Sequence, residues 1–203
     1  NRNGFYYDAN DNLVKIPAVH IQNIILAQQR AVNYAWKKGA VVVTSAGNEG
    51  LNADGNGSMF IVPAELQNVV SVSATAPDYW YYDYYFKIEP ILDIPASYTD
   101  FGRSLVDLAA PGGDFDYIDY TNGFIDMIIS TGPDNSFYFA AGTSFASPHV
   151  AGVAALVVSR YDGKITPQAV VQKLLKTADK IDGNGKTPYF GQGRVNAYRA
   201  VTE

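Results

Sequence analysis

Residues 142–156 read GTSFASPHVAGVAAL, and this stretch decides the fold class. Apolar and small residues continue on nearly every face, which predicts a helix over residues 144–160. A helix that is apolar all round is buried inside a domain, and its Gly and Ala residues allow neighbouring elements to approach closely. We therefore expect a buried central helix with Ser144 in its first turn.

Short runs of β-branched residues before this helix predict strands, at residues 40–43, 69–73, 106–108 and 127–129. The first run, AVVV, is too apolar for a half-exposed strand and favours a parallel strand covered on both faces. Amphipathic patterns predict a helix over residues 21–36, ended by Gly39, and another from the Thr166-Pro167 pair to about Ala178. Together these elements predict an α/β fold.

Ser144 is the candidate nucleophile. A hydroxyl at the start of a buried helix gains from the partial positive charge there, and the N–H groups of that turn point toward a developing oxyanion. The small residues Gly142 and Ala146 leave room for a substrate. An isolated Gly-Thr-Ser is more often an ordinary helix cap, so the interpretation depends on the whole stretch.

Asn48 is the candidate hydrogen-bond donor to that oxyanion. It stands in SAGNEG, residues 45–50, directly after the predicted strand at 40–43. A parallel strand that ends in Gly-Asn places the amide at the carboxyl edge of the sheet, where open α/β folds put their sites. The alternative for this hexapeptide alone is an Asn-containing turn, and its pairing with the serine stretch favours the functional interpretation.

Both stretches resemble the subtilisin-like serine protease family, and the serine stretch does so over fifteen positions. Weaker similarity, spanning about residues 21–201, continues through FIVPA at 60–64, NVVSV at 68–72, SYTDFG at 97–102, DLAAPG at 107–112 and GQGRVNA at 191–197. The resemblance implies a three-layer fold with a mostly parallel sheet and helices on both faces, incomplete at its N-terminal side. Residues 1–20 are then an N-terminal loop or linker, and residues 21–203 form the C-terminal part of the peptidase domain.

The resemblance also implies roles for individual residues. Ser144 would attack the peptide bond and carry the acyl group, and Asn48 would hydrogen-bond the tetrahedral intermediate. The expected substrate-binding residues are Ser45, Ala46, Gly47, Ile61, Gly142 and Thr143. The first three would form one wall of the primary pocket through their backbone. Ile61 would lie near its floor, where the family commonly has a smaller residue, so a shallow pocket is expected.

The base and its orienting carboxylate are not where the family has them. The chain order of the subtilisin triad is Asp, His, Ser, and residues 1–47 contain neither an Asp-Thr-Gly or Asp-Ser-Gly block nor a His-Gly-Thr block. His149 lies about 140° around the helix from Ser144, and His20 precedes the first helix outside any family block. Both histidines are expected to be structural.

A serine with no base within reach is a poor nucleophile, so we expect the Asp and His in a missing N-terminal segment. The chain starts at Asn1 without an initiator methionine or a signal peptide, which suggests a fragment that is inactive alone. Two other functions remain open from the sequence. One is a catalytically inactive scaffold or binding protein with the same fold, and the other is an esterase or acyltransferase that keeps the triad.

Composition and charge exclude some classes of partner. With 203 residues, 47% of them hydrophobic, the chain can bury one sizeable core. Its 15 basic and 20 acidic residues form no cationic patch, which argues against nucleic acid. No apolar run reaches the roughly 18 residues that a membrane span needs, and there are no cysteines. The resemblance, rather than the composition, implies the partners and the location. The expected partners are a polypeptide substrate and the protease's own N-terminal segment or a prodomain, and the expected location is outside the cell or in the cell envelope.

Two inserts and one loop carry further expectations. Residues 79–86, YWYYDYYF, are expected either to hold a substrate, a prodomain or a carbohydrate, or to pack on their own protein. Residues 113–120, GDFDYIDY, are expected to favour cationic substrates near the cleft. Residues 52–57, NADGNG, resemble half of a calcium loop, but Pro63 stands where its later glutamate would be, so a flexible Gly-rich loop is the favoured interpretation. No cofactor is required by this chemistry, and a structural calcium ion is the single addition that the family suggests.

Overall fold

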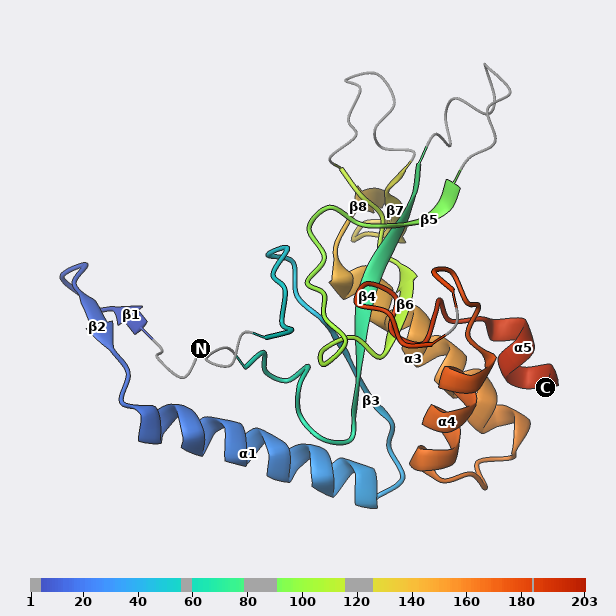
Figure 1. The fold of residues 1–203 in the computed structure, drawn as a ribbon, viewed down its shortest axis with the longest axis horizontal. Helices are drawn as coiled ribbons and strands as arrows, with labels where there is room; N and C mark the ends of the chain where they lie inside the picture. The colour runs from blue at the N-terminus through green and yellow to red at the C-terminus, as the bar shows by residue number, and fades with distance from the viewer. Residues whose placement is uncertain (1–4, 56–59, 79–90, 116–125, 184) are drawn as a thin grey trace.

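A computed structural model describes residues 5–55, 60–78, 91–115, 126–183 and 185–203 (Figure 1). Its main sheet has four strands arranged around β4 (Val69–Asp78). β3 (Val42–Ser45) and β6 (Leu108–Pro111) pair with β4 in parallel, and β5 (Ile91–Pro95) pairs antiparallel with its far half. The predicted α/β fold with a mostly parallel sheet is confirmed.

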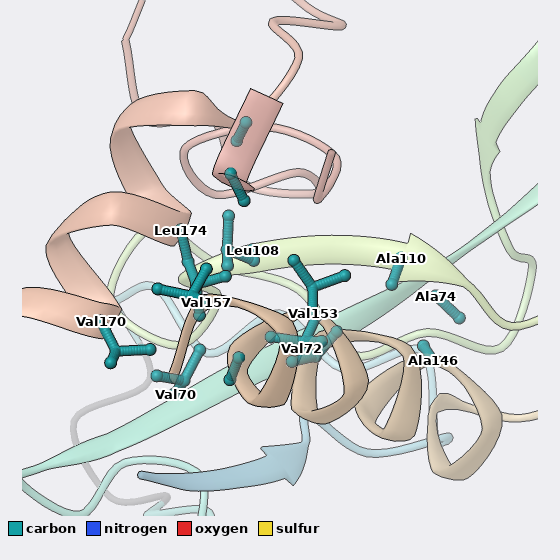
Figure 2. Packing of buried hydrophobic residues seen from close by; sticks show 14 of the residues in the cluster. Val70, Val72, Ala74, Leu108, Ala110, Ala146, Val153, Val157, Val170 and Leu174 are labelled. Atoms are coloured by element: carbon teal, nitrogen blue, oxygen red, sulfur yellow. The ribbon is translucent and has the colours of Figure 1, made fainter. Parts of the chain in front are cut away.

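The core lies between this sheet and α3 (Thr143–Arg160). Figure 2 shows Val157 of α3 close to Leu108 of β6 and to Leu174 of α4 (Pro167–Thr177). All three side chains are fully buried, so α3 joins the sheet to the C-terminal helices α4 and α5 (Ala197–Thr202). α4 begins as predicted, because the Thr166 hydroxyl accepts the N–H of Ala169 at 3.3 Å.

α3 is less buried than the sequence predicts, since the described residues cover only one of its faces. The buried positions are Thr143, Ala146, Val150, Val153, Ala154 and Val157. The outer face of α3, as we call the opposite side, is exposed and consists of Pro148, His149, Ala151, Gly152, Ala155 and Leu156. Leu156 alone has 52% of its surface exposed. The prediction of burial on every side is therefore wrong for the chain as the structure shows it.

α1 (Ala18–Lys37) contributes no buried residue and extends away from the sheet (Figure 1). Before it, β1 (Phe5–Tyr7) and β2 (Leu13–Lys15) form an antiparallel hairpin in the stretch expected to be a loop or linker. The polar residues behind that expectation build the hairpin turn, where the Asp8 carboxylate accepts the N–H of Asn12 at 2.9 Å. Among the described residues, no helix combines the length and the hydropathy that crossing a membrane requires.

The predicted strand at 127–129 belongs to a separate hairpin rather than to the main sheet. β7 (Ile128–Thr131) pairs antiparallel with β8 (Phe137–Ala140), a strand that the sequence analysis does not predict. Asp134 and Asn135 in the connection adopt φ values of 55° and 56°, which Asp and Asn tolerate and tight hairpin turns require. β7 therefore pairs with β8, the strand that follows it in the chain, and not with a strand of the main sheet.

The strand predicted at 106–108 begins at Leu108 instead and runs to Pro111. Leu105 and Val106 are nevertheless buried, at 1% and 0% exposure, because the loop before β6 packs into a second small cluster. A buried loop has the same apolar composition as a strand, so composition alone cannot separate the two.

The aromatic insert at 79–86 lies outside the described residues, and so do residues 116–120 of the acidic insert. The start of the acidic insert is described. Asp114 is 2% exposed and accepts the Ser97 hydroxyl at 2.9 Å, while the ring of Phe115 stacks on Tyr98 at 5.5 Å between centroids. Asp114 therefore faces the protein interior, which corrects the expectation of a substrate-facing charge for this residue.

Candidate active site

Ser144 lies in the first turn of α3 with its side chain exposed. Gly142, directly before the helix, donates its N–H to the carbonyl oxygen of Gly112 at 3.0 Å. Gly112 follows β6, so this bond ties the start of α3 to the carboxyl end of a parallel strand. The structure thus places the candidate nucleophile at the edge of the sheet where open α/β folds hold their sites.

Asn48 reaches the same place from the end of β3. Its Oδ1 accepts the backbone N–H of Thr143 at 2.9 Å and the Thr143 hydroxyl at 2.7 Å. Because a backbone N–H can only donate, it must face the amide oxygen, and the orientation of the Asn48 side chain is fixed. Thr143 therefore joins the two stretches that the sequence singles out and leaves the Asn48 Nδ2 group free to donate elsewhere.

Two N–H donors flank one space beside Gly142. A Cβ atom added to Gly142 would lie 3.6 Å from Asn48 Nδ2 and 3.7 Å from the backbone nitrogen of Ser144. The first N–H groups of a helix have no acceptor within it, and that of Ser144 donates to no backbone carbonyl in the described part of the chain. Two converging donors next to a hydroxyl can bind an oxygen on which negative charge develops.

The two histidines of the chain are engaged elsewhere or distant in the fold. Nδ1 of His149 lies 2.8 Å from the carbonyl oxygen of Phe145, one turn back along α3. His20 is exposed in the first turn of α1. Neither ring hydrogen-bonds to Ser144, and no other imidazole exists among the 203 residues. The expected structural role of His149 agrees with its contact to Phe145.

Two residues of the expected primary pocket, Ala46 and Ile61, are neighbours in the structure. Ala46 is fully buried and donates its N–H to the carbonyl of Val72 at 2.9 Å, which extends the pairing of β3 with β4. Ile61 packs on the small cluster that contains Ala46. The assignment of Ser45, Ala46 and Gly47 to a pocket wall and of Ile61 to its floor stays a prediction.

Phe145 adds a feature beside the candidate nucleophile that the sequence analysis missed. Its side chain borders a hollow of about 290 Å³, which it shares with residues of β7 and with Pro148 and His149. The Phe145 ring also meets Tyr138 of β8 edge to face, with centroids 6.4 Å apart. The β7–β8 hairpin thus contacts Phe145, the residue that follows Ser144, through the ring of Tyr138. The sequence gives no signal for this contact, because it depends on how the hairpin docks on α3.

The loop that resembles half of a calcium site is held by protein groups where it is described. Asp54 accepts the N–H groups of Ser104 at 2.9 Å and Arg103 at 2.7 Å, and these bonds lower its pKa. Residues 56–57 lie outside the described ranges. Among the residues that the structure describes, no three His, Cys, Asp or Glu side chains are grouped so as to hold a metal ion. A structural calcium ion stays a prediction.

Comparison with known sequences gives a consistent set of relatives. The model of the subtilase family, peptidase S8, matches residues 18–193. The chain is 40% identical to the thermophilic serine proteinase of Bacillus sp. (strain AK1), over 86% of its own length and 34% of that protein. It is 38% identical to thermitase of Thermoactinomyces vulgaris, over 85% of its own length and 48% of thermitase.

Comparison with solved structures also finds proteases. The epidermin leader peptide processing serine protease EpiP from Staphylococcus aureus matches with a TM-score of 0.73 and 27% identity, over 98% of this chain and 48% of EpiP. A lanthipeptide protease matches with a TM-score of 0.72 and 28% identity, over 98% of this chain and 58% of that protein. The chain therefore spans between 34% and 58% of the length of these four relatives.

Proposed function

The chain belongs to the subtilase family, and from this membership we propose that it carries the nucleophile and the oxyanion donor of a serine endopeptidase. Ser144 is the proposed nucleophile, and Asn48 is the proposed donor. One observation carries the proposal. The backbone N–H and the hydroxyl of Thr143 both donate to the Asn48 oxygen, so the Nδ2 group of Asn48 lies next to the space beside Gly142.

In the proposed reaction, the Ser144 oxygen attacks the carbonyl carbon of a peptide bond, and its proton passes to a histidine from outside this chain. The carbonyl oxygen becomes negatively charged and accepts hydrogen bonds from Asn48 Nδ2 and the Ser144 N–H. The C–N bond then breaks, and the imidazolium gives its proton to the leaving amine. Water hydrolyses the acyl-enzyme by the same steps and returns the proton to Ser144.

The outer face of α3 supports the proposal that another segment covers this side of the molecule. β3 pairs with β4, and no other strand among the described residues pairs with β3. An apolar helix face next to an unpaired strand edge is a surface that proteins cover, because it invites aggregation. We propose that the protein's own N-terminal segment lies there and brings the Asp and His of the triad to Ser144.

Replacing Leu156 with alanine tests this covering. If a segment packs on the outer face, Leu156→Ala should lower the free energy of unfolding of the full-length protein by about 2–3 kcal/mol, as for a buried leucine. Leu13→Ala is the matched control, because Leu13 is 58% exposed and lies on β2, away from α3. Denaturant unfolding would contradict the covering if the two substitutions had equal effects, within about 0.5 kcal/mol.

Ile61 leads to a proposal on specificity. We propose that the wall formed by Ser45, Ala46 and Gly47, with Ile61 at the floor, accepts small side chains at P1. The measurement is kcat/KM for a series of peptides that differ only at P1. Ile61→Gly should raise kcat/KM for phenylalanine at P1 relative to alanine by about 10-fold or more. A wild-type preference for large aromatic residues would contradict the shallow pocket.

Cleavage of casein by the full-length protein is the simplest test of the proposed function. The second candidate is a catalytically inactive scaffold with the subtilisin fold, in which the Nδ1 atom of His149 lies against the Phe145 carbonyl oxygen. Casein cleavage that is lost in Ser144→Ala supports the peptidase. An uncleaved substrate, together with a gene that encodes no upstream Asp and His blocks, supports the scaffold.

The name of one relative supports a proposal on where this protein acts. A protein of Xanthomonas campestris pv. campestris named "Extracellular protease" is 36% identical to the chain, which covers 25% of it. We propose that this protein likewise acts outside the cell or in the cell envelope. Recovery of the protein in the culture medium of its own organism would support this location, and its retention in the cytoplasm would contradict it.

A further inference from the structure

Asp100 lies directly behind the loop that carries Asn48. Its side chain is almost entirely buried, at 1% exposure. The Oδ1 atom accepts the N–H of Glu49 at 3.0 Å and the N–H of Leu51 at 2.8 Å. The N–H of Asp100 in turn donates to the carbonyl of Gly47 at 3.0 Å. Asp100 is therefore bonded to the chain on both sides of Asn48.

Gly47 leaves the space that the Asp100 carboxyl group fills. A Cβ atom at position 47 would collide with Asp100 Oδ2, so a larger residue there would have to displace the carboxyl group. The φ angle of Gly47 is 126°, which also favours glycine. The carboxyl group and the loop are thus in direct contact, and a displacement of one must move the other. Gly47 directly precedes Asn48, so a shift of Gly47 would also shift the backbone of Asn48.

Glu49 adds a second carboxyl group to the contact. Its Oε2 accepts the N–H of Asn48 at 3.0 Å. Burial raises the pKa of Asp100, the N–H groups of Leu51 and Glu49 oppose this, and the negative charge of the Glu49 carboxylate raises the pKa further. Like charges this close repel each other, which is why the Glu49 carboxylate opposes ionisation of Asp100. A carboxamide at position 100 should therefore keep both the shape and the hydrogen bonds of this contact.

We infer that Asp100 is a positioning residue for the proposed reaction, which it serves by holding residues 47–51 so that the Asn48 amide faces the oxyanion. This inference rests on the proposed function and deepens it. Asp100 acts through Gly47 and Glu49, the two neighbours of Asn48 in the chain. The Asn48 oxygen in turn accepts the N–H of Thr143, the residue before Ser144. A misplacement of a catalytic group by about 1 Å can cost roughly 10²-fold in rate, so a loosened loop should be visible in kcat.

The test compares Asp100→Ala with Asp100→Asn in the full-length protein. Asp100→Ala should lower kcat by about 10- to 100-fold and leave KM within about twofold, because the donor acts on the transition state. Asp100→Asn should stay within about threefold of wild type, since its oxygen still accepts both N–H groups and its amide can donate to Glu49. In an Asn48→Ala background, Asp100→Ala should change kcat by less than about twofold, because the side-chain amide that Asp100 positions is already gone.

Asp107→Ala is the control for a general loss of stability. The Asp107 carboxylate also accepts a backbone N–H, that of Ser71 at 3.1 Å, but it does not contact the loop at 47–51. This variant should be less stable and keep the kcat of its folded fraction. The inference is overturned if folded Asp100→Ala has wild-type kcat, or if its loss is undiminished in the Asn48→Ala background.

Amide hydrogen exchange gives a readout that needs no catalysis. The amides of Glu49 and Leu51 should exchange at least about 10-fold faster in Asp100→Ala than in Asp100→Asn, because their acceptor is gone. Equal exchange in the two variants would overturn the inference. A wild-type protein that shows protected amides but cleaves no substrate would instead refute the proposed function, so the two failures are distinguishable.

Discussion

Replacing Ser144 with alanine is expected to lower kcat of the full-length protein by roughly 10⁶-fold, the loss that subtilisin itself shows for its nucleophile. Without the Ser144 oxygen no acyl-enzyme can form, and what activity remains must come from the oxyanion donors and from substrate binding. The measurement is steady-state hydrolysis of a chromogenic peptide, with burst kinetics to detect the acyl-enzyme in the wild type. The burst should vanish in the variant.

Ser147→Ala is the matched control for Ser144→Ala. It also removes a serine hydroxyl from α3, at a partly buried position one turn after Ser144. We expect it to change kcat by less than about threefold, because Ser147 takes no part in the proposed chemistry. Retention of more than about 1% of the wild-type kcat by Ser144→Ala would contradict its role as the nucleophile.

Replacing Asn48 has the second largest expected effect. Asn48→Ala should lower kcat by about 10²–10³, or about 2.7–4 kcal/mol in the barrier, with KM nearly unchanged. Removal of the oxyanion-hole asparagine of subtilisin costs this much. KM should stay constant because the side chain donates to an oxygen that becomes charged only in the transition state.

Asn48→Asp separates donation from support of the local structure. An aspartate keeps oxygen acceptors for both Thr143 groups, which lie at 2.9 Å and 2.7 Å, but it has no N–H to offer. It should therefore preserve the fold and lose at least as much kcat as Asn48→Ala, since its charge would face the developing oxyanion. A loss below about 10-fold in Asn48→Asp would show that the amide does not donate in the transition state.

The central elements of the fold could be predicted because their signals are local. The helix that contains Ser144 follows from an unbroken apolar stretch, and β3 follows from a run of valines that ends in Gly-Asn. The position of Asn48 beside Ser144 was also predictable, since the carboxyl ends of parallel strands meet at one edge of the sheet. The bond from Thr143 to Asn48 confirms that the two stretches meet.

The features that the sequence does not predict depend on contacts between distant segments. Asp100 gives no local signal, because its role arises only when its loop packs behind Gly47. The docking of Phe145 against Tyr138 likewise depends on the β7–β8 hairpin. The exposure of Leu156 was missed for a different reason, since the composition of a helix shows that it should be covered but not which segment covers it.

Labelling with a fluorophosphonate, followed by peptide mapping, tests the central claim most directly. A fluorophosphonate reacts with a serine that is activated by a base and stabilised by an oxyanion site. We predict that the full-length protein is labelled at Ser144 and that the 203-residue chain alone is not labelled above the level of Ser144→Ala. A folded full-length protein without label at Ser144 would contradict the proposed nucleophile, and equal labelling of the isolated chain would contradict activation from outside it.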